Sequence, residues 1–132
     1  MLRKTAAAAK FDAPSWHTMP RFVVLTHDHP VLHWDLMLEE PQSLRTWRLA
    51  ARPSAGAEIE AEALAPHRIA YLDYEGPVSG GRGSVARYAS GHYSLLEETP
   101  AEVRISLICE GFPDSCVLRH VGETHWIACF SS

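Results

Sequence analysis

Two histidines and an aspartate in the N-terminal third of the chain are the residues whose types and spacing best suit chemistry. His27 is followed at short distance by His33 and Asp35. In a β-strand, residues two positions apart point to the same face, so the imidazole of His33 and the carboxylate of Asp35 are expected side by side. Imidazole nitrogens and carboxylate oxygens are ligands of divalent metal ions in proteins. The pattern therefore predicts a metal site made of these three side chains.

The segment that carries two of these ligands has the pattern of a half-buried strand. Apolar and polar residues alternate over positions 32–38, which is typical of a strand with one face in the core. The residues expected to face the core are Leu32, Trp34, Leu36 and Leu38. Met37 is expected on the opposite face, beside the histidine and aspartate ligands.

Short strand-like runs follow one another through most of the chain. The expected strands cover 21–25, 32–39, 44–49, 84–88, 92–96, 103–109, 116–121 and 124–130. Residues 58–64 are the only stretch rich in helix formers, and the glycine-rich segment 76–83 is expected to be a loop. Many short strands with close turns predict an all-β, mainly antiparallel fold, either a barrel or a sandwich.

Length and composition place the chain among single-domain globular proteins. A chain of 132 residues can bury one core, which we assign to residues 21–132, preceded by a flexible arm over residues 1–20. No apolar run approaches the roughly 18 residues that a membrane span needs. The formal charge of −4 argues against broad, sequence-independent coating of nucleic acid, which needs a basic surface. Three cysteines in apolar surroundings favour a reducing compartment, and we expect a cytoplasmic protein.

A second block of residues could complete a site that acts on phosphate esters. His67 can donate a proton, and Tyr71 can donate a hydrogen bond to a phosphate oxygen. The glycines on both sides of Arg82 would let the backbone or this arginine approach a ligand closely. The combination of these groups with a metal site indicates phosphoester chemistry.

Both blocks resemble a known family. The run from His27 to Glu39, HDHPVLHWDLMLE, is similar to the pattern H-D-x-x-x-L-H-[aromatic]-D-L-R-L-E of the 3′-phosphoesterase domain of bacterial ATP-dependent DNA ligase D. The block from His67 to Gly76 is similar to the same family's pattern H-P-x-x-Y-x-x-[aromatic]-E-G. The two blocks in this order, about the expected distance apart, make the resemblance specific, and it extends over roughly residues 20 to 130.

The resemblance implies a compact β-barrel with short flanking helices and manganese-dependent processing of 3′ ends. A terminal ribonucleoside is removed first and the 3′-phosphate afterwards. The resemblance implies His27, His33 and Asp35 as ligands of Mn²⁺, with Zn²⁺ as the second choice of ion. His67 and Tyr71 match the residues that contact the scissile phosphate. The implied partners are a nucleic-acid 3′ end or a small phosphate ester, together with DNA-repair proteins.

One position departs from the family pattern at the expected site. Met37 stands where the pattern has an arginine, and a thioether cannot replace the charge-assisted bonds that a guanidinium makes to phosphate. The substitution predicts weakened catalysis. Arg82 and Arg52 are the arginines that we expect to bind substrate instead, with Arg68 as a further candidate.

Two alternatives of other classes remain at this point. The first is a non-catalytic, metal-containing domain that binds a nucleic-acid end or a repair partner, which the loss of the arginine favours. The second is an oxygenase in which His33 and Asp35 bind iron together with a distant histidine, namely His92, His120 or His125. The second alternative leaves His27 without a role.

Overall fold

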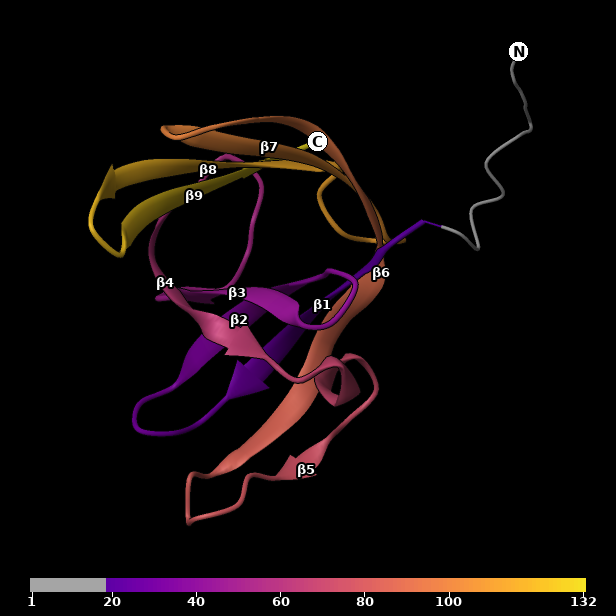
Figure 1. Ribbon diagram of the computed structural model, residues 1–132, viewed down its shortest axis with the longest axis vertical. Coiled ribbons are helices and arrows are strands. Elements are labelled where there is room, and N and C mark those ends of the chain that lie inside the picture. The colour runs from indigo at the N-terminus through magenta and orange to yellow at the C-terminus, as the bar shows by residue number, and fades with distance from the viewer. Residues whose placement is uncertain (1–18) are drawn as a thin grey trace.

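Nine antiparallel strands form one sheet that closes on itself in the computed structural model, which describes residues 19–132 (Figure 1). The strands are β1 (Arg21–His27), β2 (His33–Glu39), β3 (Leu44–Leu49), β4 (Glu58–His67), β5 (Gly76–Pro77), β6 (Ser84–Thr99), β7 (Glu102–Ile108), β8 (Ser115–Gly122) and β9 (His125–Ser131). Their order is β1-β2-β3-β4-β9-β8-β7-β6-β5, and pairing of β1 with β6 closes the ring. The all-β prediction is therefore confirmed, and the sheet is barrel-like.

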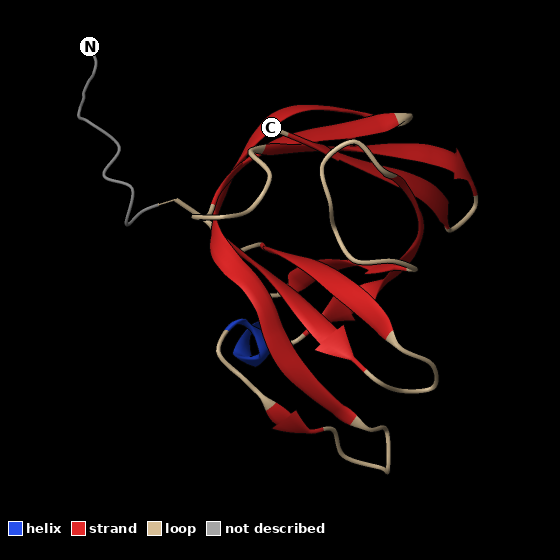
Figure 2. Ribbon diagram, turned by 180° about the vertical axis from the view of Figure 1, so that it is seen from behind, coloured by secondary structure: helices blue, strands red, loops and turns tan. Residues whose placement is uncertain are grey.

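Helical structure is much smaller than the family resemblance implied. Within residues 19–132 the one helix is the 3₁₀ helix η2 (Ile69–Leu72). It lies with β5 outside the ring of strands, where it contacts β1 and β2 (Figure 2). The segment between β4 and β6 therefore covers part of the outer face of the barrel.

One expectation about secondary structure needs correction, and one segment that was too short to assign from its composition is a strand. Residues 58–64, rich in helix formers, belong to β4, where exposed glutamates alternate with the buried Ile59 and Ala61. Pairing with β3 and β9 on either side outweighs the helical propensity of this segment. The two strands expected at 84–88 and 92–96 are one strand, β6, which runs along the molecule from β5 to β7 (Figure 1). Gly91 continues this strand because its missing side chain allows close approach to the carbonyl of Ile108.

Apolar side chains fill two separate clusters, one on each face of β1 and β2. The main core inside the barrel includes Phe22, Val24, Leu36, Leu38, Trp47, Ile105, Leu118 and Phe130. The second cluster lies under η2 and β5 and consists of Val23, Leu25, Met37, Leu44, Leu72 and Val85. The ligand-bearing face of β2 is thus apolar at the Met37 end and polar at the His33 end.

The expected division of side chains between the two faces of β2 is confirmed from His33 onward. The face away from the main core was not expected to be buried, but it is, with Met37 in the second apolar cluster. Leu36 and Leu38 are buried in the main core, and Trp34 packs against it. Leu32 is 55% exposed, contrary to the expectation, because it precedes β2 and lies in the loop after β1.

Replacing Leu36 by Ala should destabilise the protein without removing a ligand. Leu36 is fully buried and lies opposite Val24 and Trp47 in the neighbouring strands. The cavity left by the truncation should lower the free energy of unfolding by about 2–5 kcal/mol, measured by urea denaturation. Metal content should stay unchanged, and a variant of normal stability that loses metal would contradict this assignment of the two faces.

Three remaining expectations concern the termini, the cysteines and membranes. The expected arm falls almost entirely on residues 1–18, outside the described part of the chain. Cys116 is buried in the main core, and Cys109 and Cys129 are half-buried, all three as free thiols. In residues 19–132, no helix has the length and apolar character needed to cross a membrane.

Candidate metal and phosphate site

The hairpin of β1 and β2 brings the three candidate ligands together. His27 ends β1 and pairs with His33, which begins β2, so the two side chains lie on the same face of the sheet. Their ring centroids are 4.8 Å apart. Asp35 follows two positions along β2 on that face. His33 and Asp35 are each only 2% exposed, whereas His27 is half-buried.

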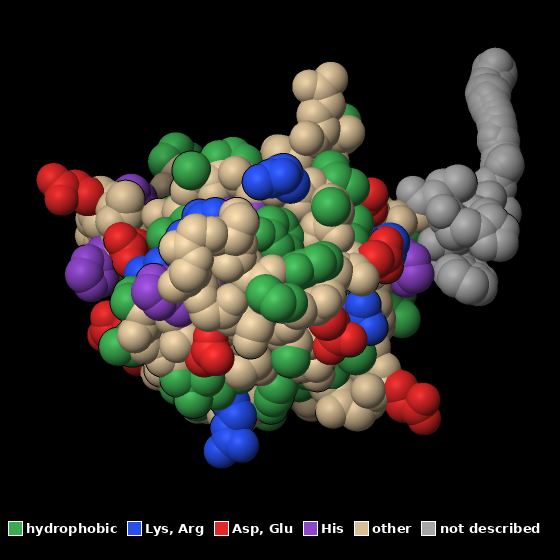
Figure 3. All heavy atoms as spheres, turned by 90° about the horizontal axis from the view of Figure 1, so that it is seen from below, with side chains coloured by type: hydrophobic (Ala, Val, Ile, Leu, Met, Phe, Trp, Pro, Cys, Tyr) green, Lys and Arg blue, Asp and Glu red, His purple; other side chains and the backbone are tan. Residues whose placement is uncertain are grey.

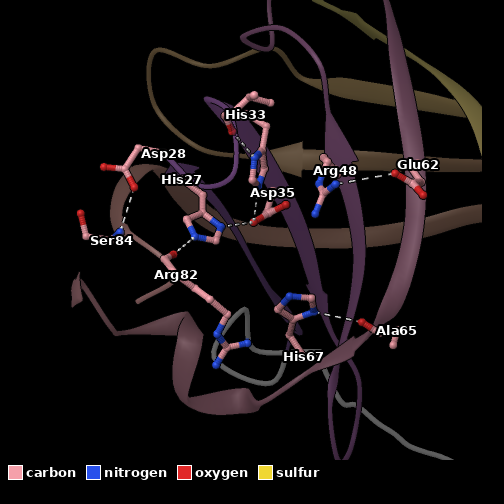
Figure 4. A network of polar contacts seen from close by, with 11 residues as sticks. His27, Asp28, His33, Asp35, Arg48, Glu62, Ala65, His67, Arg82 and Ser84 are labelled. Carbon is pink, nitrogen blue, oxygen red and sulfur yellow. Dashed lines mark hydrogen bonds and ion pairs between the residues drawn. The ribbon is translucent and has the colours of Figure 1, made fainter. Parts of the chain in front are cut away.

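The donor atoms of these residues converge on one point (Figure 4). Nδ1 of His27 and Nε2 of His33 lie 3.6 Å and 3.3 Å from the same oxygen, Oδ2 of Asp35. All three donor atoms are within 4.8 Å of one another. Metal–nitrogen and metal–oxygen bonds are about 2.0–2.2 Å long, so separations of this size suit one ion between the three atoms.

Backbone carbonyls fix which ring nitrogens carry protons. Nε2 of His27 lies 2.8 Å from the carbonyl of Arg82, and Nδ1 of His33 lies 2.8 Å from the carbonyl of Val31. A carbonyl oxygen only accepts hydrogen bonds, so these two nitrogens are the protonated ones. In the neutral rings the lone pairs therefore lie on the two nitrogens that face Asp35. Metal-binding histidines commonly have this arrangement, with the second nitrogen bonded to a carbonyl or carboxylate.

Two of the buried polar atoms at this point lack a hydrogen-bond partner. They are Nε2 of His33 and Oδ1 of Asp35, and neither is satisfied by any group in residues 19–132. Burying such atoms without partners costs free energy. A cation bound between the converging donor atoms would be a partner for Nε2 of His33, so the donor set fits the ion that the sequence predicted.

The surroundings of His33 favour positive charge. Burial is the largest influence and lowers the pKa of this imidazole. The protonated ring, however, would donate to Asp35 and be attracted by its charge, and the bond to the Val31 carbonyl also favours the protonated form; together these raise the pKa by more than burial lowers it. The pKa therefore lies above the ordinary value for histidine, although the nearby Arg48 acts in the opposite direction. A site that stabilises a protonated imidazole is electrostatically suited to a cation.

Contacts between two loops hold the Arg82 carbonyl against His27. Oδ1 of Asp28 accepts a hydrogen bond of 2.9 Å from the backbone N–H of Ser84. Gly83 adopts φ +72°, and a Cβ there would collide with Asp28 and with His29. Glycine is therefore required for this close approach, which ties the loop before β6 to the loop after β1.

A cleft of about 500 Å³ connects the candidate ligands with the second sequence block. Its walls include all three ligands, Met37, His67, Tyr71 and three arginines, Arg48, Arg68 and Arg82. His67 ends β4, and its Nδ1–H donates to the carbonyl of Ala65 at 2.9 Å, which leaves Nε2 available to the cleft (Figure 4). Tyr71 belongs to η2, and its ring centroid lies 6.0 Å from that of His67. The five side chains singled out in the sequence thus share one cleft.

The two arginines expected to bind substrate differ in their positions. Arg82 lines the cleft, and its guanidinium donates to the carbonyl and hydroxyl oxygens of Ser79 at 2.7 Å and 3.1 Å. Arg52 is exposed in the segment after β3 and is not among the residues that line this cleft. Its contact with substrate stays a prediction.

Arg48 is the cleft residue that sequence reasoning missed. It lies on β3 directly opposite Asp35, so both side chains are on the same face. The sequence predicted a strand over 44–49, but only the pairing register shows which residue of β2 lies next to Arg48. Met37, where the arginine of the family pattern is absent, is 1% exposed and packs in the second apolar cluster at the cleft wall.

The iron site with a distant histidine receives no support from the positions of His120 and His125. His120 packs against Trp126 at a ring-centroid distance of 4.8 Å, and its Nε2 contacts the carbonyl of Glu123. Nε2 of His125 lies 3.6 Å from a carboxylate oxygen of Glu60. In the described part of the chain, the group of side chains that could bind a metal consists of His27, His33 and Asp35.

The structure is an antiparallel barrel in which the candidate metal ligands and the candidate proton donors line one cleft. The chain matches the family model for the DNA ligase D 3′-phosphoesterase domain over residues 25–114, which is more than half of its length. The chain therefore belongs to this family. The matched segment includes His27, His33, Asp35, His67 and Tyr71. No curated protein matches the chain.

Proposed function

We propose that the chain is a metal-dependent phosphoesterase that acts in the cytoplasm on the 3′ ends of nucleic acid. It removes a 3′-phosphate or a terminal ribonucleoside. The observation that carries this proposal is that His27, His33 and Asp35 direct their free donor atoms to one point of the cleft that also contains His67 and Tyr71. Membership of the 3′-phosphoesterase family supports the same reaction type.

The three ligands would hold Mn²⁺, with Zn²⁺ as the second choice, through two imidazole nitrogens and one carboxylate oxygen. When bound, such an ion supplies charge neutralisation on the phosphate and lowers the pKa of a water molecule. The hydrogen bonds of His27 and His33 to backbone carbonyls keep their rings oriented for this purpose.

His67 and Tyr71 would act on the phosphate itself. Because Nδ1–H of His67 is held by the Ala65 carbonyl, Nε2 is the atom that can carry a proton to the departing oxygen. The hydroxyl of Tyr71 would donate a hydrogen bond to a non-bridging oxygen, where charge must be stabilised during transfer. Both residues line the same cleft as the metal ligands.

The surface charge suits recognition of an end better than coating of a strand. The chain carries a formal charge of −4, and on the face shown in Figure 3 basic and acidic side chains are interspersed. Sequence-independent binding along a strand depends on many phosphate contacts from a basic surface. A cleft that holds a single phosphate requires only a local positive charge, so a 3′ end or a small phosphate ester is the fitting substrate.

The test uses DNA primers that differ only in the position of the phosphate. With excess Mn²⁺, a primer with a 3′-phosphate should release inorganic phosphate, and a primer ending in a ribonucleotide should lose that nucleoside. A 5′-phosphorylated primer and a chelator-treated sample serve as controls. Absence of product from protein that has bound metal would overturn the catalytic proposal.

That negative outcome would favour the second candidate, a non-catalytic domain that binds a nucleic-acid end or a repair partner. The specific observation on its side is Met37, which leaves this position of the cleft wall without a cation. The two candidates share the metal site and differ in turnover alone.

A further inference from the structure

Arg48 is the cleft residue whose position the proposed reaction has not yet used. Its strand, β3, pairs with the ligand strand β2 so that Arg48 lies opposite Asp35. Figure 4 shows its side chain between Asp35 and Glu62. Arg48 also lines a second groove of about 400 Å³, which it shares with His33 and the exposed side chains of Val31 and Leu32. Arg48 therefore lies beside the metal ligands and lines both the cleft and the second groove.

The hydrogen-bonding capacity of this guanidinium is largely unused. Its contact with Glu62 is long, with 3.8 Å between Nη1 and the nearest carboxylate oxygen. Its Nε is buried and has no hydrogen-bond partner among residues 19–132. A guanidinium has five N–H donors and stays charged at all relevant pH values. Because Nε is buried, the terminal nitrogens are the donors that an anion in the cleft could contact.

The other two arginines of the cleft are less suited to this position. The guanidinium of Arg82 is already bound to two oxygens of Ser79. Arg68 also lines the cleft, but it is exposed and follows the end of β4. Arg48 alone among these three lies on the strand next to β2.

We propose that Arg48 forms an oxyanion subsite. It binds a non-bridging oxygen of a phosphate group that lies at the proposed metal site of His27, His33 and Asp35. This inference rests on the proposed function for the presence of a phosphate. The two terminal nitrogens of the planar guanidinium can together bind phosphate oxygens in the paired geometry that arginine prefers. Arg48 thereby supplies, from the neighbouring strand, positive charge that Met37 cannot supply.

The test measures anion binding separately from turnover. The metal-loaded protein, Arg48→Met, Arg48→Lys and the control Arg45→Met are titrated with inorganic phosphate by calorimetry after their manganese content has been determined. Arg45 lies on the same strand but pairs with Glu98 and stacks over Trp47, outside the cleft. The control therefore removes the same charge from a different place.

Arg48→Met should retain its manganese and bind phosphate about 10- to 100-fold more weakly, because one charge-assisted contact is lost. Arg48→Lys should recover part of the affinity, and Arg45→Met should bind as the unmodified protein does. If Arg48→Met does not fold, the difference between Arg48→Lys and Arg45→Met decides. Unchanged phosphate affinity in the Arg48 variants would overturn the inference, as would loss of manganese, which would make Arg48 a support for Asp35.

The outcomes separate this inference from the proposed function. Phosphate binding that depends on Arg48 in a protein without turnover would uphold the subsite and reject the enzyme. Turnover that is equal in the unmodified protein and Arg48→Met, at every primer concentration, would uphold the enzyme and reject the subsite.

Discussion

Replacing His33 by Ala should abolish stoichiometric metal binding. The unmodified protein should retain about one Mn²⁺ or Zn²⁺ per chain after dialysis, because three donor atoms converge on one point. The imidazole of His33 is more buried than that of His27, and its Nε2 has no hydrogen-bond partner in the described residues. Its removal leaves one imidazole and one carboxylate, a set too small to hold the ion. Metal content measured by plasma mass spectrometry gives the answer directly.

A matched control for this variant is His125→Ala. The imidazole of His125 is largely exposed and lies near Glu60, away from the three ligands. Its loss should leave the metal content unchanged. Stoichiometric metal in the His33→Ala protein would exclude the site described here.

Replacing His67 by Ala should leave the metal in place and reduce turnover on a 3′-phosphorylated primer by about 10²- to 10⁴-fold. His67 lies at the end of β4 and lines the cleft without belonging to the group of converging donors. Its proposed role is proton transfer at Nε2, which is fixed in orientation by the bond from Nδ1 to the Ala65 carbonyl. Single-turnover rates and metal content should be measured on the same preparations.

Two results would contradict this role. If His67→Ala loses its metal, then His67 is a ligand and not a proton donor. If the variant turns over as fast as the unmodified protein, another group protonates the departing oxygen. Changing Tyr71 to Phe in parallel separates the hydrogen-bond donor from the proton donor, since only the hydroxyl is removed.

Local patterns predicted β1, β2 and β3 near the site but not β4, which ends at His67. The alternation from position 33 onward determined which side chains of β2 face the core, and the structure agrees for Leu36 and Leu38. Leu32 fits the same alternation yet is exposed, because an alternating pattern does not show where a strand begins. Many short strands with few helix signals predicted a barrel or a sandwich, and the family resemblance favoured the barrel.

The register in which the strands pair could not be predicted from local sequence patterns. Arg48 belongs to the cleft only because β3 pairs with β2 in a register that sets it opposite Asp35. A shift of one residue would turn its side chain to the other face of the sheet. The second apolar cluster could not be predicted for a related reason. Met37 is buried by η2, a segment about 30 residues further along the chain. Residues 58–64 form a strand because they pair with β3 and β9 on either side, and not because of their own composition.

The most direct test of the proposed function is a titration of metal-free protein with Mn²⁺, in which bound metal and release of phosphate from a 3′-phosphorylated primer are measured in the same samples. The proposal predicts that the rate rises in proportion to occupancy and levels off at about one ion per chain. Full occupancy without phosphate release, or release that does not depend on the metal, would contradict it.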